Sequence, residues 1–376
     1  MTDTRTEQGA AGGVRPGADG ELPLLVMTRT TATKLWNDSA DPAELSAALG
    51  WGAVGATANP VIALAALRAD AARWRRRLVE LAQLHPVATE SELGWLVVEE
   101  LSVAAAALLE QPFLASGGRD GRLSIQTDPR LWRDADRLLA QAEHFDRLAP
   151  NIIVKIPATS AGIVAIEEAT ARGISINATV SFTVAQALAV GDAVERGLRR
   201  REAAGHDVSG MGPVCTIMVG RLDDWIRVAA DQAGVTLDPG YFEWAGVAAF
   251  KRAYGLYRER GYRARLLSAA FRNHMHWSQL VGGDVVVSPP FGWQRRLNAS
   301  GIDPVPRIDE PVAAAVVDDL YRLVGEFRRG YDPEGLAVAD FDTFGATRRT
   351  LRQFLAAAAD LDALVRDVLL PDPDRT

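Results

Sequence analysis

The chain has 376 residues, of which 48% are hydrophobic and 24% charged, and its formal net charge is −7. These values are typical of a soluble globular protein with a sizeable core, and the negative charge argues against non-specific nucleic-acid binding. The single cysteine, Cys215, excludes an intramolecular disulfide and a cysteine-rich metal site, and it favours a reduced, cytoplasmic setting.

Residues 1–22 are polar and rich in glycine and alanine, and they lack the apolar core of a signal peptide. We therefore expect a flexible N-terminal tail, followed by one domain over residues 23–376. No run of about 18 apolar residues occurs in the chain, so no membrane span is expected.

Short apolar or β-branched runs then alternate with longer amphipathic stretches. The runs predict eight strands: Lys34–Asn37, Ala53–Thr57, Leu123–Gln126, Ile152–Ile156, Ser175–Thr179, Val214–Val219, Arg265–Ala269 and Asp284–Ser288. The stretches predict helices over Pro42–Leu49, Ser91–Leu109, Pro129–Leu148, Ser160–Ala171, Thr183–Ala203, Asp223–Ala233, Pro239–Gly261 and His274–Val281. This alternation indicates βαβ units, and eight of them favour a (β/α)8 TIM barrel over an open sheet. The long connection after the second strand is expected to hold extra helices.

Two further helical patterns, Pro311–Arg328 and Thr347–Leu370, predict a C-terminal helical extension of the same domain. The last helix could lie over the mouth of the barrel. Packing on the barrel exterior is the more common arrangement and is the one that we expect.

Polar residues gather where the predicted strands end, and in barrel enzymes the chemistry lies at these carboxyl ends. Asn177 and Thr179 share one side of their strand, because side chains alternate along a strand. Asp128 precedes a proline, so it could simply cap the following helix. The other polar residues at these ends include Asp38, Thr57, Asn59, Gln126, Thr216, Arg221, Arg272 and Ser288.

One lysine stands in the middle of the apolar run N-I-I-V-K-I-P-A-T. Three of the 41 Lys+Arg residues are lysines, which leaves 38 arginines, so this chain uses arginine where it needs only a positive charge. An amine can lose its proton when it is buried, whereas a guanidinium cannot. Lys155 could thus attack a ketone and form an iminium, an electron sink for breaking a C–C bond. The alternative is a structural lysine that forms a salt bridge inside the barrel.

The sequence resembles the transaldolase family, Schiff-base aldolases that fold as (β/α)8 barrels. The resemblance runs from about Lys34 to Pro290 and is less clear beyond. It rests on motifs in the family's order: L-W-N-D-S, G-A-T-A-N-P, S-I-Q-T-D-P-R-L, N-I-I-V-K-I-P-A-T-S-A-G-I-V-A-I, G-I-S-I-N-A-T-V-S-F, V-G-R-L-D-D-W and F-R-N.

The resemblance implies a role for each matching residue. Lys155 is the Schiff-base lysine, and Asp38 assists proton transfer during C–C cleavage and formation. Thr179 holds the catalytic water, and Gln126 stands at the position of a catalytic residue. Substrate binding falls to Asn59 and Asn177 for the hydroxyls of a dihydroxyacetone unit, to Arg221 and Arg272 for the phosphate, and to Thr57, Thr216 and Ser288.

The chain also departs from the family pattern. Transaldolases normally have Glu at the position of Gln126, and glutamine cannot titrate. Fructose-6-phosphate aldolases also have Gln there but supply a tyrosine from strand six, where this chain has Met218. A serine that commonly assists phosphate binding is replaced by Ala270.

His274 and His276 are additions that bear on the missing acid/base. Either could replace it, because imidazole titrates near neutral pH. Alternatively, both lie in a helix that covers the barrel. A metal site made from this pair is disfavoured, because residues i and i+2 do not share a helix face.

The expected reaction transfers a dihydroxyacetone unit from a ketose phosphate to an aldose acceptor, as in the pentose phosphate pathway, without metal or organic cofactor. We expect sugar phosphates as partners, no nucleic acid or membrane, and a monomer or homodimer. One alternative is a specialised transaldolase-like aldolase for another sugar or aldehyde. The other is a sugar-phosphate-binding protein that has lost catalysis.

Overall fold

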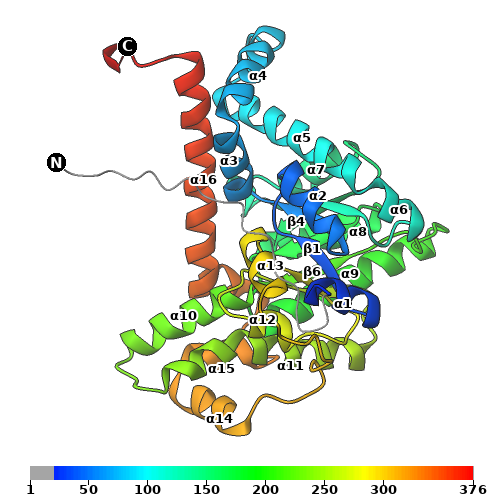
Figure 1. The fold of residues 1–376 in the computed structure, drawn as a ribbon, viewed down its shortest axis with the longest axis vertical. Coiled ribbons are helices and arrows are strands. Elements are labelled where there is room, and N and C mark those ends of the chain that lie inside the picture. The colour runs from blue at the N-terminus through cyan, green and yellow to red at the C-terminus, as the bar shows by residue number, and fades with distance from the viewer. Residues whose placement is uncertain (1–20, 376) are drawn as a thin grey trace.

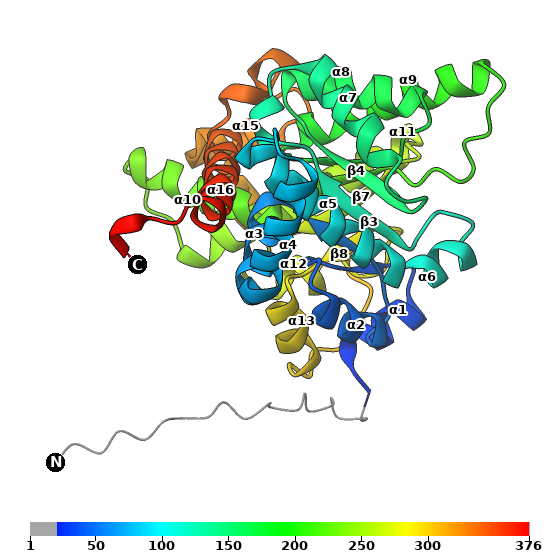
Figure 2. The same ribbon diagram turned by 90° about the horizontal axis from the view of Figure 1, so that it is seen from above.

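Eight parallel strands close a barrel in chain order in the computed structural model, which describes residues 21–375 (Figures 1 and 2). Most of the expected tail, residues 1–20, lies outside the described residues. The strands are β1 (Lys34–Asn37), β2 (Ala53–Ala58), β3 (Arg122–Gln126), β4 (Ile152–Pro157), β5 (Ile176–Thr179), β6 (Val214–Ile217), β7 (Arg265–Ala269) and β8 (Val286–Ser288). The pairing of β1 with β8 completes the ring and confirms the (β/α)8 barrel.

Helices surround this barrel. Those up to the last strand are α1 (Pro23–Thr30), α2 (Pro42–Gly50), α3 (Pro60–Ala69), α4 (Ala71–Leu84), α5 (Glu90–Leu108), α6 (Glu110–Ala115), α7 (Ala135–Asp146), α8 (Ser160–Ala171), α9 (Val184–Ala203), α10 (Val219–Gln232), α11 (Ala245–Arg260) and α12 (Met275–Ser278). After β8 come α13 (Phe291–Asn298), α14 (Ala314–Leu323), α15 (Gly325–Tyr331) and α16 (Gly345–Leu369). Short 3₁₀ turns are η1 (Pro129–Leu131), η2 (Pro239–Trp244), η3 (Val338–Thr343) and η4 (Pro373–Arg375). The extra helices expected after the second strand are α3 to α6.

Local chemistry shifts several boundaries from their expected places. The strand expected over Val214–Val219 ends at Ile217, because α10 already begins at Val219. The helix expected over Pro129–Leu148 is broken, since the Asp134 carboxylate accepts a hydrogen bond from the Arg137 amide and starts α7. The helix expected over Pro311–Arg328 is likewise divided into α14 and α15, by an extended Val324.

The barrel interior is filled in layers. At its N-terminal end, the buried Arg265 donates to the Asp120 carboxylate at 2.8 Å, and the buried Arg122 donates to backbone carbonyls. The Trp36 indole lies above them, and Gly55 leaves room for it, because a Cβ on Gly55 would come within 2.4 Å of the ring. Ile153, Val214, Leu267, Ala269 and Val286 complete this apolar layer. The polar side chains that follow therefore lie at the C-terminal end of the barrel.

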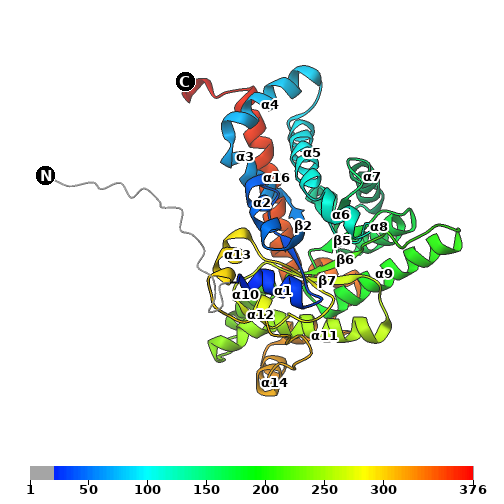
Figure 3. The ribbon, with the colours of Figure 1, turned by 45° about the vertical axis from the view of Figure 1, so that its right-hand side comes forward.

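The last helix, α16, runs beside α3 (Figures 1 and 3). It contacts α3, η1 and α10, which begin just after β2, β3 and β6. It also packs on α4 and α5. The expected packing on the barrel exterior therefore holds for its contacts with α3, α4 and α5, and its contacts with η1 and α10 also bring it beside elements that begin at the C-terminal end of the barrel. An amphipathic pattern shows that a helix packs, but not against which neighbour.

Among residues 21–375, no helix is both long enough and apolar enough to cross a membrane.

Candidate active site

Lys155 points into the barrel from β4. Its neighbour Ile153, two residues earlier, belongs to the apolar layer inside the barrel, whereas Val154 and Ile156 pack against the surrounding helices. Lys155 is 3% exposed. Burial lowers the pKa of its amine; the Asp38 charge opposes this shift, and the Arg221 charge adds to it. The local sequence thus places a readily deprotonated amine above the apolar layer.

Amide side chains lie on both sides of Lys155. Gln126 on β3 and Asn177 on β5 are its register partners. Asn177 donates from Nδ2 to Ser124 Oγ at 3.0 Å, and its Oδ1 accepts from Thr216 Oγ1 at 2.8 Å. These bonds fix the orientation of the Asn177 amide and leave one of its N–H groups for a ligand.

Asp38 follows β1 and is half-buried. Its Oδ1 accepts a hydrogen bond from Thr57 Oγ1 at 2.5 Å, which joins the ends of β1 and β2. The bond occupies one oxygen of the carboxylate and leaves the other able to exchange a proton. The structure therefore brings Asp38, Thr57 and Lys155 to the same end of the barrel.

Asn59 caps a helix, a structural role that was not expected in addition to substrate binding. Its Oδ1 accepts from the amides of Val61 and Ile62 at 3.0 Å and caps α3. Asn followed by proline at the first helical position is a capping signal that the sequence already contained. Asp128 caps η1 by accepting from the Arg130 amide at 2.9 Å, as expected.

Several buried polar atoms at this end have no hydrogen-bond partner among the described residues. They are Gln126 Oε1, Thr179 Oγ1 and Ser288 Oγ. An unsatisfied buried polar group costs about 1–3 kcal/mol, so such atoms call for a water or a ligand. Their place around the barrel end makes them candidates to bind the oxygens of a polar substrate.

The backbone is held in an uncommon conformation directly after Thr179. Val180 has φ +52°, which is costly for a β-branched residue. The fully buried Gln186 holds this turn, because its Nε2 donates to Val180 O and Ala158 O and its Oε1 accepts from the Phe182 amide. The role of Gln186 was not predicted from the sequence, although its spacing from Thr183 is that of a capping box.

Arg221 and Arg272 lie together beside a cavity of about 350 Å³. Arg221, in the first turn of α10, donates to Thr350 Oγ1 at 3.1 Å and stacks on the Phe354 ring at 5.3 Å, both on α16. Arg272 pairs with Asp224 at 2.8 Å and also donates to the carbonyls of Ala270 and Phe271. The two arginines expected to bind a phosphate are thus brought together.

His276 does not face this cavity as a free acid or base. It is fully buried; its Nδ1 accepts from the Arg272 amide at 3.0 Å, and its Nε2 lies 2.7 Å from Asp223 Oδ2. Its ring therefore links Asp223 to the backbone of Arg272. His274 contacts Ser278 within the same short segment. These positions favour the expectation of a covering helix over that of a replacement proton donor.

Comparison with known proteins decides the family. The sequence model described as Transaldolase/Fructose-6-phosphate aldolase matches residues 35–316. The chain belongs to this family. It is 36% identical over 208 residues to Transaldolase 1 of Streptomyces avermitilis and to the transaldolase of Mycolicibacterium smegmatis, and 39% identical over 160 residues to that of Mycobacterium leprae.

These alignments cover 55%, 55% and 41% of this chain and 54%, 55% and 43% of those relatives. The chain therefore spans about half the length of the curated relatives it matches.

Two departures from the family pattern have clear positions. Gln126 occupies the register position next to Lys155, where the resemblance implies Glu in transaldolases. Met218, at the position where fructose-6-phosphate aldolases are expected to have tyrosine, is 6% exposed and directly precedes α10. Neither side chain titrates. Gln126 therefore cannot act as the proton shuttle that Glu provides in transaldolases, and Met218 cannot act as the one that tyrosine provides in fructose-6-phosphate aldolases.

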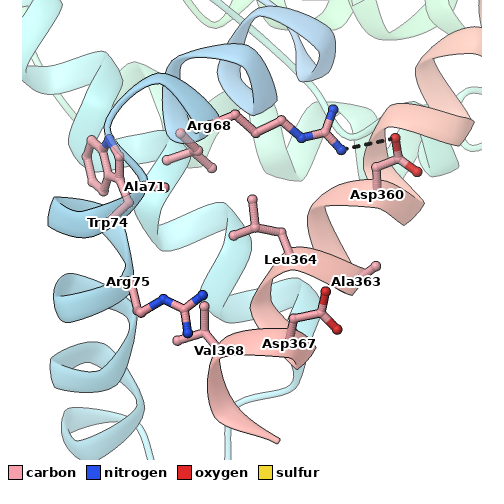
Figure 4. Close-up of a pocket in the computed structure, with 10 residues that line it drawn as sticks. Arg68, Ala71, Trp74, Arg75, Asp360, Ala363, Leu364, Asp367 and Val368 are labelled. Atoms are coloured by element: carbon pink, nitrogen blue, oxygen red, sulfur yellow. Dashed lines mark ion pairs between the residues drawn. The ribbon is translucent and has the colours of Figure 1, made fainter. Parts of the chain in front are cut away.

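A separate cavity of about 320 Å³ lies between α3, α4 and the distal half of α16 (Figure 4). Trp74 and Leu364 line it, and Arg68 pairs with Asp360 across it at 3.6 Å. None of the candidate catalytic residues lines it. Because both charged partners are mostly exposed, the ion pair contributes little to stability. No cluster of three or more potential metal ligands occurs within residues 21–375.

Proposed function

We propose that the chain is a Schiff-base enzyme of the transaldolase type, which transfers a dihydroxyacetone unit from a ketose phosphate to an aldehyde. The observation that carries this proposal is the buried Lys155 amine, whose pKa is lowered and which lies between Gln126 and Asn177 near the Asp38 carboxylate. Such an amine serves as a nucleophile toward a ketone.

In the first step, Nζ of Lys155 attacks the C2 carbonyl carbon of the donor. The carbinolamine then loses its C2 oxygen as water and becomes an iminium. We assign this water to Gln126 Oε1 and Thr179 Oγ1, and the assignment is supported by the lack of a hydrogen-bond partner for either atom within residues 21–375. Asn177 and Ser288 would hold the neighbouring hydroxyls of the donor.

In the second step, Asp38 accepts the proton of the C4 hydroxyl, and the C3–C4 bond breaks. The bonding electrons move to the iminium nitrogen and leave an enamine on Lys155, while the aldehyde departs. The enamine then attacks the acceptor aldehyde, and Asp38 returns its proton to the new hydroxyl oxygen. Water hydrolyses the resulting iminium and releases the product. The lysine supplies the electron sink, so this sequence needs no organic cofactor or metal.

The proton at the carbinolamine stage also requires a carrier. With Gln126 and Met218 in place of Glu and Tyr, Asp38 is the carboxylate whose charge acts on the pKa of Lys155. We therefore assign both proton transfers to Asp38, with the water between Gln126 and Thr179 completing the path.

A specialised aldolase for another sugar or aldehyde is the second candidate. Gln126 and Ala270 favour it, because they remove the acid/base and the serine of the standard enzyme. A sugar-phosphate-binding protein without catalysis is disfavoured by the retention of Lys155, Asp38 and Thr179 together. The sugar-phosphate partners, the pentose-phosphate type of pathway and the cytoplasmic setting belong to the proposal as well.

The test is a transfer assay with sedoheptulose 7-phosphate and glyceraldehyde 3-phosphate, in which fructose 6-phosphate and erythrose 4-phosphate are measured. Wild type should form both products, and Lys155→Ala should form neither. Wild-type cleavage of other ketoses with no turnover of this pair would favour the specialised aldolase. Binding without turnover of any ketose would favour the non-catalytic protein.

A further inference from the structure

The cavity beside Arg221 and Arg272 has a third arginine, Arg349, which comes from the second turn of α16. Arg349 is exposed and has no hydrogen-bonded or ion-paired partner within residues 21–375. In the sequence it stands among other arginines in R-R-T-L-R, so nothing there distinguished it.

The charges around this cavity do not balance. Its lining contains three guanidinium groups and one carboxylate, that of Asp224, and the carboxylate is already bound by Arg272 through Nε at 3.0 Å and Nη2 at 2.8 Å. Arg221 donates to the Thr350 hydroxyl, whereas the Arg349 side chain has no hydrogen-bonded or ion-paired partner in the part of the chain that the structure describes. Three positive charges against one negative charge leave an excess of two.

The excess positive charge affects the pKa of Arg221. Burial, followed by the charges of Arg272 and Arg349, lowers the pKa of Arg221 to about 10, although the charges of Asp38 and Asp224 oppose this shift. Arg221 remains protonated at neutral pH, so the three groups repel one another while the cavity holds no anion. An anion would relieve this repulsion.

Helix ends add to the positive field. The cavity is lined by residues from the first two turns of α10 and of α16, and neither helix has a side-chain cap at its N-terminus. Unsatisfied amides at a helix N-terminus carry partial positive charge. A phosphate monoester has a charge of about −1.5 to −2 near pH 7, which matches the excess.

We propose that Arg349 is a substrate-binding residue that completes, with Arg221 and Arg272, a site for the phosphate dianion of the substrate. This inference rests on the proposed function and assigns part of the substrate specificity to α16. Thr350 and Phe354 of the same helix hold Arg221, so α16 both positions one arginine and contributes another. Arg349 thereby offsets the loss of the phosphate-binding serine at Ala270.

The experiment compares Arg349→Ala with Arg348→Ala, its exposed neighbour, which does not line the cavity. Because a charge-assisted hydrogen bond contributes about 1.5–3 kcal/mol and 1.4 kcal/mol is tenfold, Arg349→Ala should raise the KM for a phosphorylated donor about tenfold or more. Its KM for dihydroxyacetone, which has no phosphate, should not change. Arg348→Ala should match wild type with both donors.

A second arm titrates inorganic phosphate into each protein by calorimetry and needs no turnover. Arg349→Ala should weaken phosphate binding about tenfold, and Arg348→Ala should not. Equal affinity of Arg349→Ala and wild type for phosphate would overturn the inference, as would equal losses in both variants. If wild type forms no reducible adduct, the proposed function fails, while this arm still decides the role of Arg349.

Discussion

Gln126 and Lys155 are register partners on the neighbouring strands β3 and β4, and their side chains leave the same side of the barrel wall. Gln126 Oε1 has no hydrogen-bond partner among the described residues. We predict that Gln126→Glu raises the rate of dihydroxyacetone transfer between standard sugar phosphates, because it restores a titratable group beside the Schiff-base position. Steady-state kinetics of both proteins test this.

Gln126→Ala is the control for this substitution and should lower the rate, because it removes the polar atom that would hold the water. If Gln126→Glu leaves the rate unchanged or lowers it, the proton path does not pass through this position.

The pH dependence of adduct formation should follow the charges around Lys155. The free amine forms as the pH rises through the pKa of Lys155, which burial places below its ordinary value of 10.5. Arg221→Ala removes a positive charge and should move this transition to higher pH, whereas Asp38→Asn removes a negative charge and should move it to lower pH. Trapping of dihydroxyacetone by cyanoborohydride across a pH series measures both shifts. Shifts of the same sign in the two variants would contradict the electrostatic assignment.

His276 should act as a positioning residue. We predict that His276→Gln lowers the free energy of unfolding by about 1–3 kcal/mol, because it disturbs a buried hydrogen-bond network. It should raise the KM for a phosphorylated donor, since the Arg272 amide loses its acceptor, but leave the pH profile of kcat unchanged. Disappearance of an ionisation from that profile would instead identify His276 as the acid or base.

The apolar layer below Lys155 depends on Gly55. We predict that Gly55→Ala lowers the free energy of unfolding by about 1–3 kcal/mol, because the added methyl group overlaps the Trp36 indole. Gly50→Ala is the matched control, since nothing lies within 4 Å of its added Cβ. Urea unfolding of both variants tests this, and equal stabilities would show that Trp36 moves without cost.

The barrel could be predicted because it depends on a local pattern, the alternation of short apolar runs with amphipathic stretches. The candidate site residues were predicted from the polar ends of the strands and from the resemblance to the transaldolase family, and the structure brings Lys155 and Asp38 to the same end of the barrel. For Asn59, substrate binding was predicted, but its capping hydrogen bonds to α3 were not. Boundaries such as the end of β6 were displaced by helix starts that apolar pattern alone does not reveal.

The contributions of α16 could not be predicted, because they depend on where a distant helix packs. The spacing of Phe354 and Leu361 indicates an amphipathic helix but not its neighbour. The partnership of His276 with Asp223 is of the same kind, since 53 residues separate them. Such contacts form only when distant segments of the chain pack together, so no local sequence pattern predicts them.

The central claim is that Lys155 forms a Schiff base with a ketose. Intact-mass spectrometry after borohydride reduction, with a panel of ketoses and ketose phosphates, tests it most directly in wild type and Lys155→Ala. We predict a reduced adduct of dihydroxyacetone size on the wild type alone. The absence of an adduct from every donor, or an equal adduct on Lys155→Ala, would contradict the claim.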